Sequence, residues 1–196
     1  RLEDAIEARL GADVFTPGDQ AGGPRSIELA DGLRLFVLDT AWWLLDADER
    51  PAGEFDGENV RSPADVATYL EQQIDDRDDD RIIVVGHHPV RSNGAYAGYR
   101  TPAQTVASLG LGPLIGQTTG TSVQDLASER YREMRGVLDN LFTQHDRLVY
   151  VSAHDRALET FDVVRSEINR QTYLVSGTGG GRASAAAHGR GAAHVL

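Results

Sequence analysis

Short apolar runs alternate along this chain with segments whose apolar residues recur at helical spacing. Three runs rich in Val, Ile, Leu and Tyr, at 33–38, 81–85 and 148–152, are interpreted as buried strands. Helical spacing after residue 62 and again before residue 142 predicts two amphipathic helices. A strand, a helix and a second strand in this order form a βαβ unit, so we expect parallel strands joined by a right-handed crossover.

Turn and capping residues set the ends of these elements. The segment 62–65 (Ser-Pro-Ala-Asp) predicts a helix start with an N-cap serine and a proline at the first helical position. A similar capping box over 122–125 predicts the start of the second helix. Asp31 and Gly32 predict a hairpin turn, and residues 157–175 predict a second hairpin.

Between these elements the chain is rich in Gly or in polar residues. Residues 91–121 form a long Gly-rich connection, and loops of this length in compact domains are usually functional or mobile. Trp42 and Trp43 open a polar loop and predict a packed cover over the core. We therefore expect one domain over residues 1–181, followed by a Gly/Ala-rich tail over 182–196.

The charge balance and two absent residue types narrow the function. Acidic residues outnumber basic ones by 30 to 19, and the net charge of -11 disfavours a nucleic-acid backbone as the partner. The chain has no cysteine, which excludes disulfides, thiolate nucleophiles and zinc–thiolate sites. It also has no lysine, which excludes a Walker-type phosphate loop and a Schiff-base enzyme within these residues.

Polar side chains follow three of the predicted strands. Asp39 follows the first, His87 and His88 follow the second, and His154 follows the third. Ligands of open α/β sheets bind at the carboxyl ends of the strands, so we expect these residues at one edge. Converging histidines indicate a metal site or an acid–base pair, and an ordinary polar role for each histidine stays open.

Three short motifs in this order resemble the second half of the calcineurin-like metallophosphoesterases, which include the purple acid phosphatases. They lie at 85–90 (Val-Gly-His-His-Pro-Val), 150–156 (Tyr-Val-Ser-Ala-His-Asp-Arg) and 174–177 (Leu-Val-Ser-Gly). Segments 38–40 and 92–94 are similar to a bacterial branch in which the phosphoesterase often precedes an outer-membrane surface-antigen barrel. The resemblance covers most of the chain.

The resemblance implies a fold, a metal content and a set of site residues. The fold is an α/β metallophosphoesterase-type β-sandwich flanked by helices, which this chain would contain without its N-terminal part. One or two ions of the Fe, Mn or Zn class would occupy a complete site. By the motifs, His87 and His154 would bind the same metal. His88 is a neighbour of that ligand, and we expect it to contact substrate. Arg91 and Asn93 follow the same turn and could line the substrate cleft, with an ordinary mobile loop as the alternative.

Two departures from the family pattern affect the expected activity. The family's N-terminal Asp-x-His and Gly-Asn-His motifs are not present in these residues, and Gly18-Asp19 lies too close to the later strands to be the family's Gly-Asp. Arg156 stands where the family has the last histidine, and arginine cannot bind a metal because it stays protonated. Its guanidinium could instead take a catalytic role by gripping a phosphate bidentately. The alternative is a surface arginine in a domain that has lost activity.

Three functions follow from these residues. The first is metal-dependent hydrolysis of a phosphoester, with this chain supplying part of the site. The second is a binding or scaffolding domain of the same fold without activity, and the third is an unrelated α/β module. The resemblance implies the missing N-terminal half or a membrane-associated domain of the same protein as partner. It also favours the cell envelope or periplasm, with the cytoplasm left open.

Overall fold

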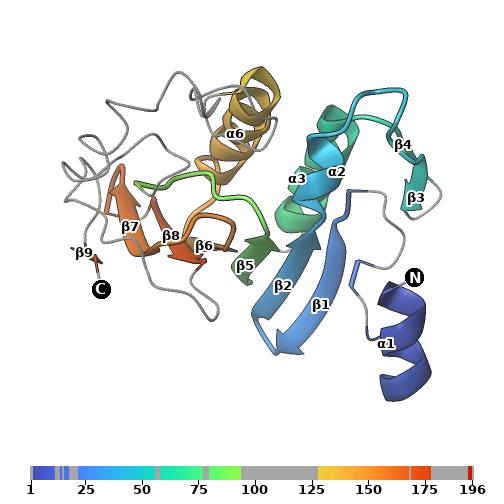
Figure 1. The fold of residues 1–196 in the computed structure, drawn as a ribbon. Helices are drawn as coiled ribbons and strands as arrows, with labels where there is room; N and C mark the ends of the chain where they lie inside the picture. The colour runs from blue at the N-terminus through green and yellow to red at the C-terminus, as the bar shows by residue number, and fades with distance from the viewer. Residues whose placement is uncertain are drawn as a thin grey trace.

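A seven-stranded mixed sheet is the centre of the computed structural model (Figure 1). The structure describes residues 2–11, 14, 16–17, 22–55, 58–76, 80–93, 128–167, 169–177 and 194–195. The strand order is β1-β2-β5-β6-β8-β7-β9, and β3 and β4 form a separate two-stranded sheet. The strands are β1 (Arg25–Ala30), β2 (Leu33–Leu38), β3 (Gly53–Phe55), β4 (Glu58–Val60), β5 (Arg81–Gly86), β6 (Leu148–Ser152), β7 (Leu158–Val164), β8 (Arg170–Ser176) and β9 (His194–Val195).

The central strands of this sheet are parallel. β2 pairs with β5, β5 with β6, and β6 with β8, all in parallel, while β1 and β7 are antiparallel to their neighbours. The helices are α1 (Leu2–Leu10), α2 (Thr40–Trp43), α3 (Pro63–Asp75) and α6 (Glu129–Phe142). The α/β fold class is confirmed, and so are the parallel pairing of the three predicted strands and both predicted hairpins.

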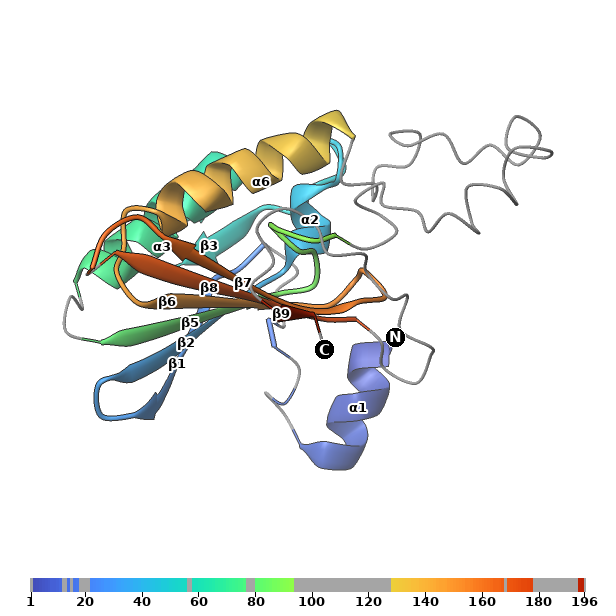
Figure 2. The same ribbon diagram turned by 90° about the vertical axis from the view of Figure 1, so that its left-hand side faces the viewer.

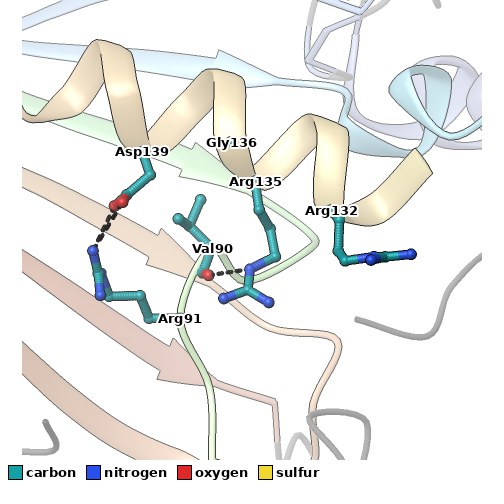
Figure 3. A pocket seen from close by; sticks show the side chains of 6 residues that line it. All are labelled: Val90, Arg91, Arg132, Arg135, Gly136 and Asp139. Carbon is teal, nitrogen blue, oxygen red and sulfur yellow. Dashed lines mark hydrogen bonds and ion pairs between the residues drawn. The ribbon is translucent and has the colours of Figure 1, made fainter. Parts of the chain in front are cut away.

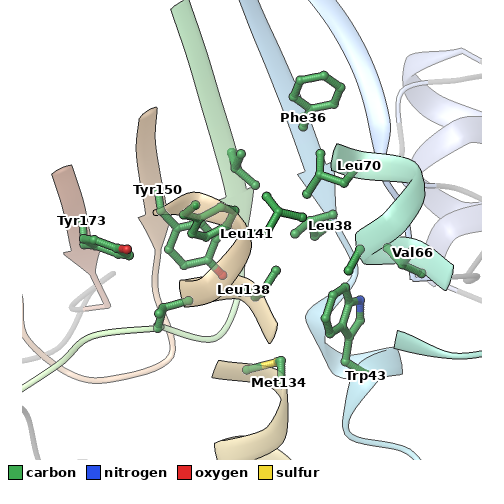
Figure 4. Close-up of a cluster of buried hydrophobic side chains, with 14 of the residues drawn as sticks. Phe36, Leu38, Trp43, Val66, Leu70, Met134, Leu138, Leu141, Tyr150 and Tyr173 are labelled. Atoms are coloured by element: carbon green, nitrogen blue, oxygen red, sulfur yellow. The ribbon is translucent and has the colours of Figure 1, made fainter. Parts of the chain in front are cut away.

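Helices α3 and α6 lie on one face of the sheet, whereas α1 lies on the other side (Figure 2). Residues of β5 and β6 alternate between buried and half-buried, because successive side chains point to opposite faces. The buried face packs against the apolar stripes of the two helices (Figure 4). Phe36, Leu70, Leu138 and Tyr150 in this core have no exposed surface. Burying side chains of this size is the main stabilising contribution to the fold.

The ends of the elements follow the predicted capping chemistry. Ser62 accepts a hydrogen bond from the backbone N–H of Asp65, whose carboxylate accepts one from the N–H of Ser62, so the capping box is confirmed. α6 has Ser128 as its N-cap, and the capping box predicted over 122–125 lies outside the described residues. Gly32 has a φ of +70°, which a hairpin turn requires and glycine tolerates.

The polar loop predicted after Trp42 contains regular structure instead. Asp39 caps α2, where its carboxylate accepts hydrogen bonds from the N–H groups of Ala41 and Trp42. The β3–β4 hairpin follows. Trp42 and Trp43 are each 1% exposed, so their predicted role as a packed cover is confirmed. Of the predicted tail, residues 194–195 form β9 against β7, and the rest lies outside the described residues, as does most of the 91–121 connection.

Candidate metal centre

The polar residues that follow β2, β5 and β6 lie together at the carboxyl edge of these parallel strands, as predicted. Asp39 follows β2, and His87 and His88 follow β5. His154 comes two residues after the end of β6. The backbone N–H of Ala153 donates a 3.0 Å hydrogen bond to the His87 carbonyl, which ties the two histidine segments together. The parallel pairing of β5 and β6 therefore brings the two histidine segments to one place.

The imidazoles of His87, His88 and His154 form one compact cluster. Each offers a ring nitrogen, and these three atoms lie within 4.8 Å of one another. Nδ1 of His154 lies 3.2 Å from Nε2 of His87, and the rings of His88 and His154 are 4.5 Å apart between centroids. The ring of His87 is exposed, that of His154 is half-buried and that of His88 is buried. The cluster is thus open to solvent on the His87 side.

Thr40 positions the buried ring of His88. The Thr40 hydroxyl has no exposed surface, and it accepts a 3.1 Å hydrogen bond from the backbone N–H of His88. The same oxygen lies 2.9 Å from Nδ1 of the His88 ring. Nε2 of His88 is buried and has no hydrogen-bond partner in the described part of the chain. A buried polar atom without a partner is costly, so this nitrogen is available to a ligand.

The turn that carries His87 and His88 is fixed by four hydrogen bonds to its carbonyls. Besides the bond from Ala153 to His87, the Tyr150 hydroxyl donates to the His88 carbonyl at 2.7 Å. The Tyr131 hydroxyl donates to the Pro89 carbonyl at 3.0 Å, and Nε of Arg135 donates to the Val90 carbonyl at 2.6 Å. Every carbonyl from residue 87 to residue 90 therefore has a donor, and the turn is held before any ligand arrives.

Two glycines allow the close approach of the segments around the cluster. A Cβ on Gly86 would lie 2.5 Å from the Tyr150 hydroxyl and 2.7 Å from Cγ2 of Thr40. A Cβ on Gly177, after β8, would clash with the Asp155 carbonyl. His154 itself has a φ of +48°, a conformation that is uncommon for residues with a side chain. Strained backbone of this kind concentrates at functional sites.

Burial and neighbouring rings favour the neutral form of the His87 and His88 imidazoles. Burial, together with the neighbouring rings of His154 and His87, lowers the pKa of His88 to about 3. Burial also lowers the pKa of His87, as does His154, whereas the nearby Asp39 carboxylate raises it. Neutral imidazole is the form that binds transition metals. A catalytic zinc ion normally takes three protein ligands and keeps one position open, which matches the number of nitrogens here.

The remaining predicted site residues lie around the cluster and not in it. Arg156 is exposed, two residues after His154. Arg91 donates to both carboxylate oxygens of Asp139, at 2.7 and 3.0 Å, and lies over the ring of Tyr173. Asn93 is 4% exposed. The imidazoles are thus brought together, whereas Arg91 is directed toward α6.

A buried acidic pair beside the cluster was not predicted. Asp155 has no exposed surface, and its carboxylate accepts a 2.7 Å hydrogen bond from the Ser92 hydroxyl. Glu159 is 2% exposed and accepts a 2.9 Å hydrogen bond from the backbone N–H of Asn93. Burial raises the pKa of Glu159. The pair anchors the segment after the histidine turn to the β6–β7 connection and to β7, and no sequence signal distinguishes it from surface acids.

Comparison with known proteins returns similarities of fold at low identity. No family model matches the chain, and no curated protein sequence does. The chain is similar to GAP50, the anchor in the inner membrane complex of Plasmodium, with 16% sequence identity and a TM-score of 0.35. The match covers 80% of this chain and 36% of GAP50. The chain is also similar to a dimetal phosphatase from Danio rerio, with 12% sequence identity and a TM-score of 0.40. That match covers 78% of this chain and 48% of the phosphatase.

A third similar structure is that of PhoD. The identity is 9%, the coverage is 79% of this chain and 28% of that chain, and the TM-score is 0.43. The chain thus spans less than half the length of each of these three proteins. Within the described residues, no helix is long and apolar enough to cross a membrane.

Proposed function

We propose that this chain supplies part of the metal centre of a phosphoester hydrolase, with His87, His88 and His154 as ligands of one divalent cation. The observation that carries the proposal is the convergence of three ring nitrogens within 4.8 Å at the carboxyl edge of the parallel strands. A cation bound there would polarise phosphoryl oxygens and activate water for attack on phosphorus. The motifs that resemble the metallophosphoesterases support the same reaction.

His88 enters this ligand set for a structural reason, although its sequence position predicted a contact with substrate. Its Nε2 is buried without a partner in the described residues, while its Nδ1 is occupied by Thr40. A neutral ring that donates through Nδ1 has its lone pair on Nε2, which is the atom a metal requires. Hydrogen bonding of the second ring nitrogen is the usual way in which proteins orient ligand histidines.

Arg156 is proposed to bind the phosphoryl group of the substrate. It is exposed on the segment that carries His154, and a guanidinium matches two phosphate oxygens at once. Arg156→Ala should therefore raise KM or lower kcat and leave the bound metal unchanged. Arg156→His should raise the metal content toward two ions per chain if a second site lies beside it, and an unchanged content would contradict a displaced metal ligand.

The decisive experiment measures metal content and turnover together. Purified chain is stripped with a chelator and titrated with Zn²⁺ or Mn²⁺, and hydrolysis of bis-p-nitrophenyl phosphate is followed at each metal ratio. His87→Ala, His88→Ala and His154→Ala should each weaken binding strongly. His145→Ala is the matched control because His145 lies outside the cluster, beside Asp75. Absence of a stoichiometric ion in the wild type would refute the proposal.

A metal-binding domain without catalysis is the second candidate. Within the described residues, the imidazole cluster is the one group of three or more ligand side chains, and it contains no carboxylate. That composition supports one ion and leaves a bridged two-ion site without ligands. Stoichiometric metal without turnover would favour this candidate, and turnover that depends on the metal would favour the hydrolase.

We also propose that a further segment of the same protein packs on the sheet face opposite α3 and α6. That face carries half-buried apolar side chains from four strands: Leu35, Val37, Ile83, Val85, Val149, Val151 and Leu174. An apolar face of this size is typical of a sheet that receives a second layer. The longer protein should then bind more metal per chain than these 196 residues do, and equal metal content would count against the added layer.

A further inference from the structure

A second charged site lies on the C-terminal side of the histidine turn, against α6. A cavity of about 220 Å³ opens there, and Figure 3 shows the six side chains around it. They are Val90, Arg91, Arg132, Arg135, Gly136 and Asp139. None of the three clustered histidines lines the cavity. Three guanidiniums and one carboxylate leave two net positive charges in a chain whose overall charge is -11.

The positive charges in this cavity are only partly neutralised. Asp139 pairs with Arg91 at 2.7 Å. Among the described residues, no carboxylate lies within ion-pair distance of Arg132 or Arg135. These two arginines are three residues apart on α6, so their side chains leave the same side of the helix. An anion in the cavity would balance the positive charge that Asp139 does not neutralise.

Hydrogen bonds through Nε orient the guanidinium groups of Arg132 and Arg135 and leave their terminal nitrogens as donors for a ligand. Nε of Arg135 donates to the Val90 carbonyl at 2.6 Å, and Nε of Arg132 donates to the Ser128 carbonyl at 3.4 Å. The bond to Val90 directs the Arg135 guanidinium into the cavity beside Arg91 (Figure 3). Nε of Arg91 is buried and has no partner in the described part of the chain. Burial lowers the pKa of Arg135, and the Arg91 charge acts in the same direction.

Gly136 forms part of the wall of the cavity. It lies in the interior of α6, where glycine costs about 1 kcal/mol relative to alanine. A Cβ added at this position would meet nothing within 4 Å, so packing does not require the glycine. A longer side chain between Arg135 and Asp139 would project into the space that the guanidiniums border.

We propose that this cavity is a binding site for a small dianion of the phosphate class, held by the terminal nitrogens of Arg132 and Arg135. Arg91, clamped by Asp139, forms the opposite wall. Two net positive charges match a dianion, and planar guanidiniums present paired donors to phosphate oxygens. Pockets for drug-sized ligands measure about 300–1,000 Å³, so a smaller cavity suits a compact anion. The site does not rest on the proposed metal chemistry.

The test is calorimetric titration of the full chain with inorganic phosphate in the presence of a chelator. Chloride at equal ionic strength measures non-specific screening, and glycerol phosphate tests whether an esterified phosphate also enters. Arg132→Gln and Arg135→Gln should each weaken phosphate binding about tenfold, since each removes a charge-assisted contact. Arg170→Gln removes an exposed arginine of β8 and should leave the affinity unchanged. His87→Ala should also bind phosphate as the wild type does.

The outcomes separate this site from the metal centre. Phosphate binding that survives chelation and His87→Ala, and falls in both α6 variants, supports the proposal. Binding of phosphate no tighter than chloride, or an equal loss in Arg170→Gln, would overturn it. Arg132 is exposed, so its variant remains informative if Arg135→Gln folds poorly. Entry of glycerol phosphate assigns the site to phosphate esters, and its exclusion assigns the site to the free anion.

Discussion

Replacing Thr40 by valine tests whether the metal centre is held in place by a buried hydroxyl. The side chain has no exposed surface, and its oxygen serves both the backbone N–H and Nδ1 of His88, at 3.1 and 2.9 Å. Valine has nearly the same shape, so the variant opens no cavity. It does leave two buried polar groups of His88 without a partner.

The expected cost follows from those two groups. Each buried polar group that loses its partner costs about 1–3 kcal/mol. Because both groups share one oxygen, we expect Thr40→Val to lower the free energy of unfolding by about 2–4 kcal/mol. That is a large share of the roughly 5–15 kcal/mol by which domains are stable. Thr40→Ser keeps the oxygen and loses one methyl group, and it should cost about 1 kcal/mol.

Urea denaturation followed by tryptophan fluorescence measures these differences. Thr172→Val is the matched control, because the Thr172 hydroxyl of β8 donates an exposed hydrogen bond to Asp162. This variant should change the free energy of unfolding by less than about 0.5 kcal/mol. In ¹⁵N NMR spectra the wild-type His88 should show a protonated Nδ1, and this preference should disappear in Thr40→Val. A Thr40→Val variant as stable as the wild type, or a Thr40→Ser variant as unstable as Thr40→Val, would refute the assigned role.

Two further predictions concern acid stability and the core. The pKa of His88 is lowered from 6.5 to about 3, so between these values the unfolded chain binds a proton that the folded chain does not. Stability should fall as the pH drops through this window, and His88→Gln should flatten the slope between about pH 7 and pH 5 in urea titrations. An identical slope would contradict a neutral His88. Leu70→Ala, at a fully buried position of α3, should cost about 2–5 kcal/mol, whereas Leu29→Ala, at a position 50% exposed, should cost less than about 0.5.

The elements that were predicted correctly are those whose signals are local. Ser62 and Asp65 specify the start of α3 by contacts within four residues. The runs of β2, β5 and β6 are apolar at successive positions, a pattern typical of the central parallel strands that they form. Helix α2 was missed because four residues carry no periodicity. Its formation depends on the Asp39 cap and on the burial of Trp42 and Trp43, which only the folded chain provides.

The directions of the side chains around the site could not be predicted, because distant contacts determine them. The motif at 85–90 indicates that His87 and His88 end a strand, but not that His88 turns inward toward Thr40, which is 48 residues earlier in the chain. Arg91 was expected beside the substrate from its closeness to His87. The motif does not indicate its pair with Asp139, 48 residues later, which forms because α6 packs against the histidine turn and offers a carboxylate there. A short motif therefore identifies residues that belong to one region, whereas the packing of α2 and α6 decides which of them share a cavity.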